Sequence, residues 1–256
     1  MPRSVSTGLA ALLLGVALLP GPVHAFAQFG GTALTNLTLT GVGGGQTLPS
    51  GVSVLYSTAV GDVRAFSFGR GATVSAESVL NPDPAAEPIE MPFGEPLRQG
   101  HSVDGWAGDG YADARMLTNG LIFLSNDTNN SVTFSFYYAI DAVLTAAADP
   151  LGIQARVDVS WVIDDLLGLV DPGTGGSQSI SLGAYADPDI GTRELTASGV
   201  FSITLAAHGE DTLNSGLDTW GIAEAPEPPV WALIAAGLVS GLARVPARAR
   251  LRRRGL

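Results

Sequence analysis

Acidic and aromatic side chains gather in one short stretch, from Asp104 to Asp113. The stretch reads Asp-Gly-Trp-Ala-Gly-Asp-Gly-Tyr-Ala-Asp, so Trp106 and Tyr111 alternate with carboxylates and glycines. Carboxylate oxygens on a glycine-rich loop suit Ca²⁺, although the spacing is not that of an EF-hand loop. Aromatic rings beside carboxylates also suit a sugar, because rings stack on sugars and carboxylates accept bonds from hydroxyls. The alternative is that both rings are apolar anchors of a loop, and that Asp104 and Asp109 are solvated.

Side chains for acid–base or nucleophilic catalysis are sparse. Beyond residue 27 the only histidines are His101 and His208, and the chain has no cysteine. This set lacks the spacing of a zinc site and excludes thiol catalysis. His101 is followed by Ser102 and Asp104, but the Gly-x-Ser-x-Gly pattern of a nucleophile elbow is absent. We therefore predict a non-catalytic domain, and expect His208 to be a turn residue.

The charge of the chain argues against nucleic acid as a partner. All 13 basic residues are arginines, and seven of them lie close to the two ends. The segment 26–225 has six arginines against 23 acidic residues, which gives a formal net charge of −17. A surface this acidic repels phosphate backbones and is typical of a soluble exported domain.

The first 27 residues have the pattern of a secretory signal peptide. Arg3 supplies the positive charge, residues 8–19 are an apolar run, and Pro20 ends it. Small residues at the −3 and −1 positions permit cleavage after Ala25 or after Ala27. The run is shorter than the roughly 20 residues of a membrane anchor. We therefore expect export by the Sec machinery and cleavage by signal peptidase.

The last residues, 225–256, predict a second processing segment. Pro226 and Pro228, on either side of Glu227, prevent a helix from continuing, and the apolar segment 230–243 follows. We expect this segment to be a transmembrane helix with Trp231 at the outer interface and a basic cluster in the cytoplasm. The arginines that define the cluster are Arg250, Arg252, Arg253 and Arg254.

The order of these features resembles the PEP-CTERM domain of exosortase substrates. The matching parts are Pro226-Glu227-Pro228, the apolar helix from Trp231, and the terminal arginines. The resemblance implies that the tail holds the protein in the inner membrane of a Gram-negative bacterium until an exosortase cuts near Pro-Glu-Pro. It also implies a final place at the cell surface or in the extracellular matrix, with exopolysaccharide as an expected partner. An ordinary single-pass C-terminal anchor is the alternative.

Between the processed ends, residues 28–224 alternate between apolar and polar side chains. Strict alternation predicts strands with one buried and one solvated face. The clearest runs are residues 132–140, 155–163, 179–184 and 200–205. Weaker ones are 34–40, 52–56, 63–68, 72–78, 112–117 and 121–125. We expect an all-β fold, an antiparallel, jelly-roll-like β-sandwich of about ten strands between an N-terminal signal helix and a C-terminal transmembrane helix.

Two segments within this domain are less regular. Residues 81–100 contain five prolines and no alternation, so we expect a long surface loop. Residues 141–148 have a composition that also permits a helix. We favour a strand that leads into a turn at Asp149-Pro150.

Three hypotheses on function follow. The first is a matrix-associated surface protein, which explains both ends, the acidic charge and the lack of catalytic motifs. The second is a carbohydrate- or Ca²⁺-binding module, which requires Trp106 and Tyr111 to be exposed beside Asp104 and Asp109. The third is a hydrolase, which requires two carboxylates to converge in a cleft. We favour the first.

Overall fold

The computed structural model describes residues 25–81, 87–150, 152–165, 170–171 and 179–226. Within them the chain forms strands and connections only, and no helix there is long and apolar enough to cross a membrane. The strands are β1 (Ala27–Val42), β2 (Val52–Arg70), β3 (Thr73–Asn81), β4 (Ile89–Glu90), β5 (Pro96–Ala107), β6 (Asp109–Asn126), β7 (Val132–Ala148), β8 (Gln154–Asp165), β9 (Val170–Asp171), β10 (Ser179–Ala186), β11 (Thr192–Leu205) and β12 (Gly209–Ala225). The prediction of an all-β fold is confirmed.

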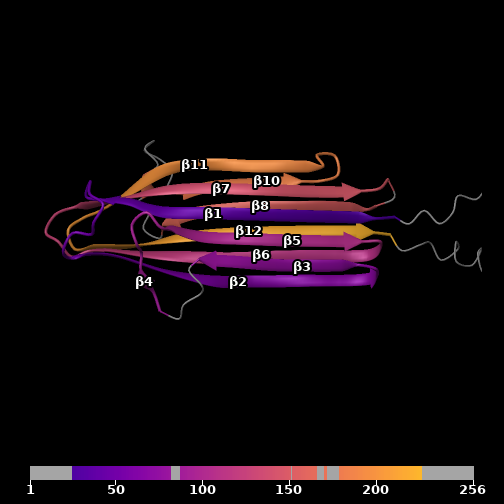
Figure 1. The fold of residues 1–256 in the computed structure, drawn as a ribbon, viewed down its shortest axis with the longest axis horizontal. Helices are drawn as coiled ribbons and strands as arrows, with labels where there is room; N and C mark the ends of the chain where they lie inside the picture. Colours follow the sequence, from indigo (N-terminus) through magenta and orange to yellow (C-terminus); the bar gives the residue numbers. More distant parts are fainter. Residues whose placement is uncertain (1–24, 82–86, 151, 166–169, 172–178, 227–256) are drawn as a thin grey trace, which may run out of the picture.

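The strands form two six-stranded sheets that pack face to face (Figure 1). Sheet A has the strand order β3-β5-β1-β7-β11-β9, and sheet B has the order β10-β8-β12-β6-β2-β4. The paired strands run antiparallel in both sheets. The last strand, β12, lies between β6 and β8 in the middle of sheet B.

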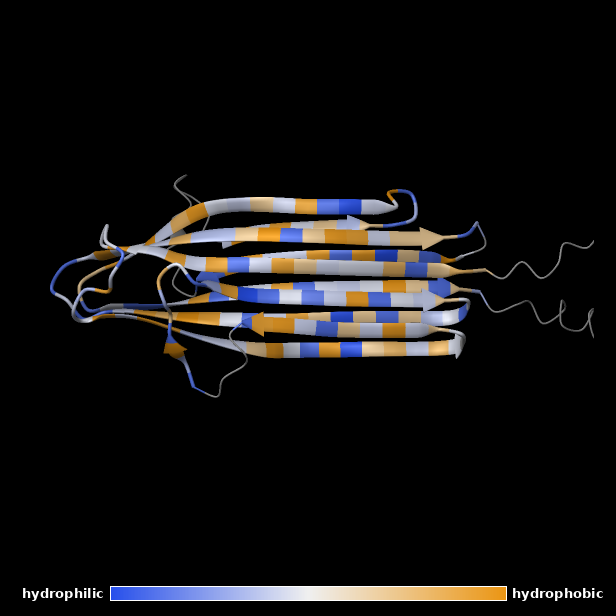
Figure 2. Ribbon diagram, in the orientation of Figure 1, coloured by the Kyte–Doolittle hydropathy of each residue, from blue (hydrophilic) through white to orange (hydrophobic). Residues whose placement is uncertain are grey.

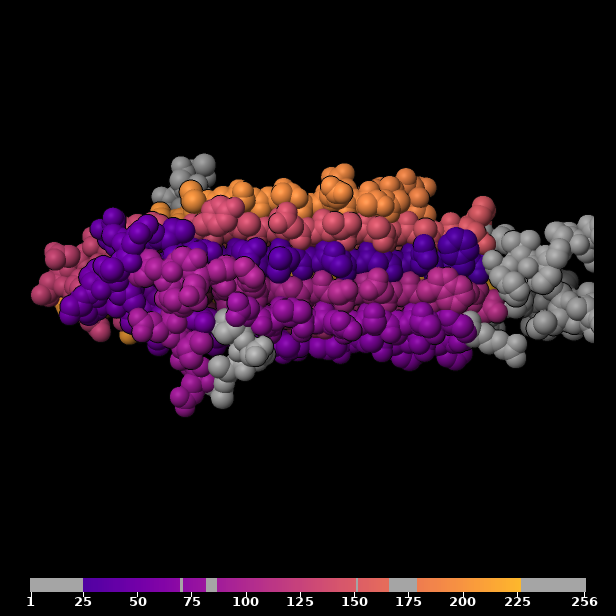
Figure 3. All heavy atoms as spheres, viewed as in Figure 1, coloured from indigo at the N-terminus to yellow at the C-terminus, as the bar shows by residue number. Residues whose placement is uncertain are grey.

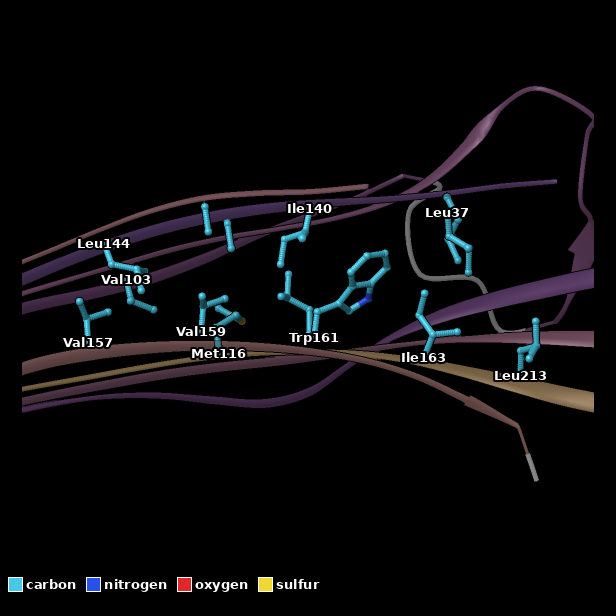
Figure 4. Packing of buried hydrophobic residues seen from close by; sticks show 14 of the residues in the cluster. Leu37, Val103, Met116, Ile140, Leu144, Val157, Val159, Trp161, Ile163 and Leu213 are labelled. Carbon is cyan, nitrogen blue, oxygen red and sulfur yellow. The ribbon is translucent and has the colours of Figure 1, made fainter. Parts of the chain in front are cut away.

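The period-two pattern sets which face of each strand is buried. Along β1 every second residue from Ala27 to Leu39 is buried, including Phe29, Leu37 and Leu39, while the alternate residues are exposed or half-buried. Figure 2 shows the same apolar and polar alternation along the long strands. In Figure 4, Ile140 of β7 and Trp161 of β8 point into the space between the sheets. Burial contributes roughly 2 kcal/mol for each large apolar side chain, so these alternating positions stabilise the pairing of the two sheets.

Polar side chains also connect the sheets inside the core. Gln99 of β5 donates from Nε2 to the carbonyl oxygen of Ser215 on β12 at 2.9 Å. The Ser215 hydroxyl accepts the indole N–H of Trp161 at 2.9 Å and donates to Gln99 Oε1 at 3.1 Å. Because a buried polar group is costly when it lacks a partner, this network favours one relative placement of the two sheets.

Several strands are longer than the apolar pattern predicts. The runs 52–56 and 63–68 belong to one strand, β2, which contains a bulge between Val60 and Asp62. The runs 112–117 and 121–125 likewise merge into β6. The prediction of two separate strands in each of these stretches was wrong. Glycine and asparagine interrupt the apolar alternation there, but the hydrogen-bonded ladder of the backbone continues through them.

The proline-rich segment is only partly a loop, which corrects the prediction for residues 81–100. Strand β4 pairs with Leu55 and Tyr56 of β2, and β5 begins at Pro96. Proline is tolerated at the first residue of a strand because its missing N–H need not join the ladder there. Residues 82–86 lie outside the described part. The strand prediction for residues 141–148 is confirmed, since they complete β7.

Among the described residues, β2 pairs only with β6 beyond Tyr56, so it is an edge of sheet B there. Unpaired strand edges invite association with other strands. The bulge at Val60 and the charged side chains of Asp62 and Arg64 interrupt this edge, which are two common ways of protecting it, although Val63, Phe66 and Phe68 are exposed along the same strand.

Strand β1 begins and β12 ends at the same end of the sandwich (Figure 1). There the Phe29 ring packs so closely on Gly221 of β12 that a Cβ on this glycine would lie 2.2 Å from the ring. Most of the predicted signal peptide (1–27), namely residues 1–24, lies outside the described residues. So do the predicted helix 230–243 and these residues of the predicted tail: Glu227, Pro228, Trp231, Arg250, Arg252, Arg253 and Arg254.

Candidate functional site

The turn at Gly108 divides the stretch of acidic and aromatic residues from Asp104 to Asp113. It joins β5 of sheet A to β6 of sheet B. Asp104 and Trp106 lie on the outer face of sheet A, while Tyr111 lies on the outer face of sheet B. The structure therefore brings Asp104 and Trp106 together but separates them from Tyr111. Asp109 is half-buried and is the first residue of β6.

Figure 3 shows the outer face of sheet A. A shallow hollow lies on this face near the end where β1 begins. Its volume is about 720 Å³, and its lining includes Gln28, Gly30, Asp104, Trp106 and Thr145. Gly30 pairs with both Asp104 and Thr145 across the sheet. A Cβ on Gly30 would lie 2.9 Å from Asp104 Oδ1 and 3.0 Å from Thr145 Oγ1, so the missing side chain leaves this space open.

Trp106 forms one rim of the hollow and is 36% exposed. Its indole ring lies against the turns at Gly71 and Gly108, where added Cβ atoms would come within 3.0 Å and 2.3 Å of ring atoms. The backbone of these two glycines thus packs directly on the indole ring and holds it in place. It serves as an anchor of the corner and still offers part of its surface to solvent.

The outer face of sheet B carries a network centred on Asp113, which is 7% exposed. Its carboxylate accepts hydrogen bonds from Arg64 Nη2 at 2.8 and 3.0 Å, from the Tyr111 hydroxyl at 3.0 Å, and from the Trp220 indole N–H at 3.2 Å. Burial and the bond to Asp113 raise the pKa of Tyr111. Donors from β2, β6 and β12 thus meet at one carboxylate.

Two further ion pairs continue this network along the same face. Arg115 donates to Asp218 at 2.6 and 3.1 Å, and this bond raises the pKa of Arg115. Arg156 donates to Asp158 with two bonds of 2.7 Å. A hollow of about 320 Å³ lies among these groups. We name its lining the Trp220 face, which consists of Arg64, Arg115, Asp158, Ser160, Asp218 and Trp220.

The sequence pattern did not indicate the Trp220 face, because its residues come from strands that are far apart in the sequence. Arg64 is 49 residues from Asp113, and Trp220 is 107 residues from it. One signal was present: Tyr111, Asp113 and Arg115 alternate along β6 and so share one face. Polar residues at every second position of a strand, like apolar ones, therefore indicate side chains that share one face.

His101 does not form a triad with its sequence neighbours. Its ring is 4% exposed in the core, with Nδ1 3.0 Å from Thr219 Oγ1 and Nε2 3.0 Å from Thr118 Oγ1. Ser102 and Asp104 point to the opposite face of sheet A. Burial lowers the pKa of His101 to about 4, and the charge of Asp218 opposes this shift. His101 therefore acts as a neutral tie between the sheets.

His208 lies in the turn between β11 and β12, as predicted, with φ of 58°. In the described part of the chain, no group of three or more His, Asp or Glu side chains is placed to hold a metal ion. Asp104 and Asp113, two carboxylates of the predicted Ca²⁺ cluster, lie on opposite outer faces.

A comparison with known proteins found no matching family model, no matching curated protein and no matching solved structure.

Proposed function

We propose that this chain is an exported surface or matrix protein, processed by an exosortase, whose β-sandwich is a non-catalytic passenger. The observation that supports it most directly is the place where the folded domain ends. Ala225, the last residue of β12, pairs with Gly110 and is 3% exposed, and Pro226 follows it directly. A cut near Pro226-Glu227-Pro228 therefore removes no strand residue and leaves the core intact.

The buried core is consistent with release of the domain in a folded state. The described apolar core extends from Ala25 to Ala225 and contains side chains from both sheets. A domain with a complete core of its own does not need the tail for stability. In this proposal the tail holds the protein in the inner membrane, and the released sandwich then resides at the cell surface or in the extracellular matrix. The jelly-roll-like connectivity and the two helical ends stay predictions.

The test is the intact mass and the fractionation of the native protein, with and without the exosortase of the producing cell. We expect a soluble or matrix-bound species that ends near Pro226 and disappears when the enzyme is absent. Replacing Glu227 and Pro228 by alanine should block release, whereas Pro229→Ala is a matched control outside the motif. A membrane-held protein that keeps Arg254 in both strains would show an ordinary C-terminal anchor.

A second candidate function is carbohydrate binding at the hollow on sheet A. Trp106 is partly exposed there beside Asp104, which is half of the arrangement this function requires. Trp106→Ala should weaken binding to a neutral polysaccharide, and Asp104→Asn should weaken it with less effect on packing. This hollow does not support the hydrolase hypothesis, because Asp104 is the only carboxylate among its lining residues.

A further inference from the structure

Trp220 is held in a fixed orientation on the outer face of sheet B. Its indole N–H donates to Asp113, and its neighbours across the sheet are Arg115 on β6 and Asp158 on β8. The side chain is half-buried, so part of its surface still meets solvent. A ring that is fixed before a ligand arrives loses little conformational entropy on binding.

Asp113 is the group that fixes this arrangement. A carboxylate that is 7% exposed is costly unless hydrogen bonds satisfy it. Asp113 accepts bonds from Arg64, Tyr111 and Trp220, which arrive from three strands. These bonds restrain the side chains around the hollow, as the supporting residues of a preorganised binding site do.

The chemistry of the lining indicates the class of ligand. Arg64, Arg115 and Ser160 offer donors, while Asp158 and Asp218 offer acceptors, within a hollow of about 320 Å³. A sugar hydroxyl is both a donor and an acceptor, so a lining that mixes the two suits a polyhydroxylated ring. The apolar face of such a ring can stack on an indole.

The charges indicate that the ligand is neutral. Arg64 and Arg115, the two arginines of the lining, are already paired with Asp113 and Asp218. No unbalanced positive charge is therefore left for a carboxylate or sulfate group. The surrounding segment, 26–225, has a formal net charge of −17, which repels acidic polysaccharides.

We propose that the Trp220 face binds a pyranose unit of a neutral polysaccharide, with the sugar ring on Trp220 and its hydroxyls on Asp158, Asp218 and Ser160. The site lies on the opposite outer face from Trp106 and is independent of the hollow there. It is also independent of the sorting proposal, because its residues all belong to the sandwich.

The test is electrophoresis of the full chain, in a polyoxyethylene detergent, through native gels that contain dextran, hydroxyethylcellulose or galactomannan. Gels with alginate and gels without polysaccharide are the references. We expect at least one neutral polysaccharide to retard the protein, and alginate not to do so. Trp220→Ala should weaken this binding about tenfold or more, because a buried aromatic anchor often dominates binding.

Two further variants keep the test decisive if Trp220→Ala unfolds. Ser160→Phe fills the hollow while every member of the Asp113 network stays in place, so it should also abolish retardation. Tyr137→Ala, which removes a 40% exposed aromatic from sheet A, should leave it unchanged. Retardation that survives both Trp220→Ala and Ser160→Phe, or that only Trp106→Ala removes, overturns the proposal. So does a wild-type protein that none of the three neutral polysaccharides retards.

Discussion

The buried histidine predicts a specific loss of stability in mild acid. The pKa of His101 is about 4 in the folded protein, against about 6.5 for a solvated histidine in the unfolded chain. Between pH 6.5 and pH 4, His101 therefore binds a proton in the unfolded state but not in the folded state. The contribution of His101 is fully present above pH 6.5 and is lost as the pH falls toward 4.

The size of this effect follows from the shift. One pKa unit corresponds to about 1.4 kcal/mol, so lowering the pH from 7.5 to 5 should reduce the free energy of unfolding by about 2 kcal/mol through His101 alone. The direction comes from burial between Thr118 and Thr219, where an imidazolium would lose its hydration. The wild-type slope contains the titration of every ionisable group, so on its own it is not diagnostic of His101.

The assay is urea unfolding at several pH values between 5 and 7.5, on wild type and His101→Gln. The glutamine removes the titrating group, so the difference in unfolding free energy between the two proteins should shrink by about 2 kcal/mol toward pH 5. His208→Asn is the matched control, since asparagine tolerates the positive φ of that exposed turn. Equal pH slopes in wild type and His101→Gln would refute the reasoning.

Three other predictions concern packing and processing. Signal peptidase should cut after Ala25 and not after Ala27, because Ala27 is fully buried and pairs in β1; the intact mass of the mature protein distinguishes the two starts. Gly221→Ala should cost about 1–3 kcal/mol by forcing a Cβ into Phe29, whereas Gly216→Ala on the same strand has room; thermal unfolding compares them. Asp113→Asn should lower the free energy of unfolding by about 1 kcal/mol, a modest value because Arg64 is half exposed, and urea unfolding of Asp109→Asn gives the reference.

The sequence predicted the type of fold well because burial acts on every second residue of a strand. Phe134 and Phe136 of β7 and Val157 and Val159 of β8 are buried at the positions that alternation assigned to the core. Strand ends were harder to predict. Backbone pairing continues through polar and glycine positions such as Asn119, where the apolar pattern pauses but the ladder to β2 and β12 does not.

The candidate site was predictable only in part, for a geometric reason. Trp106 and Tyr111 are close in sequence, yet the chain crosses from one sheet to the other at Gly108, so their side chains emerge on opposite outer faces. Arg64 and Trp220 meet at Asp113 only because β2, β6 and β12 are adjacent in one register. Periodicity gives the face of a residue within its own strand, and it contains no information on which strand comes to lie beside it.

The central place of β12 determines when the chain can fold. Sheet B lacks its middle until residues 209–225 are present, because β6 and β8 are joined only through this last strand. Long-range pairing of this kind is slow. If the chain is exported as we propose, pairing cannot finish while the final strand is still crossing the membrane. Ala225 is also the last residue before the predicted tail. An apolar segment that halts translocation there would give the sandwich its complete set of strands while the protein is still tethered, so folding would precede cleavage and release.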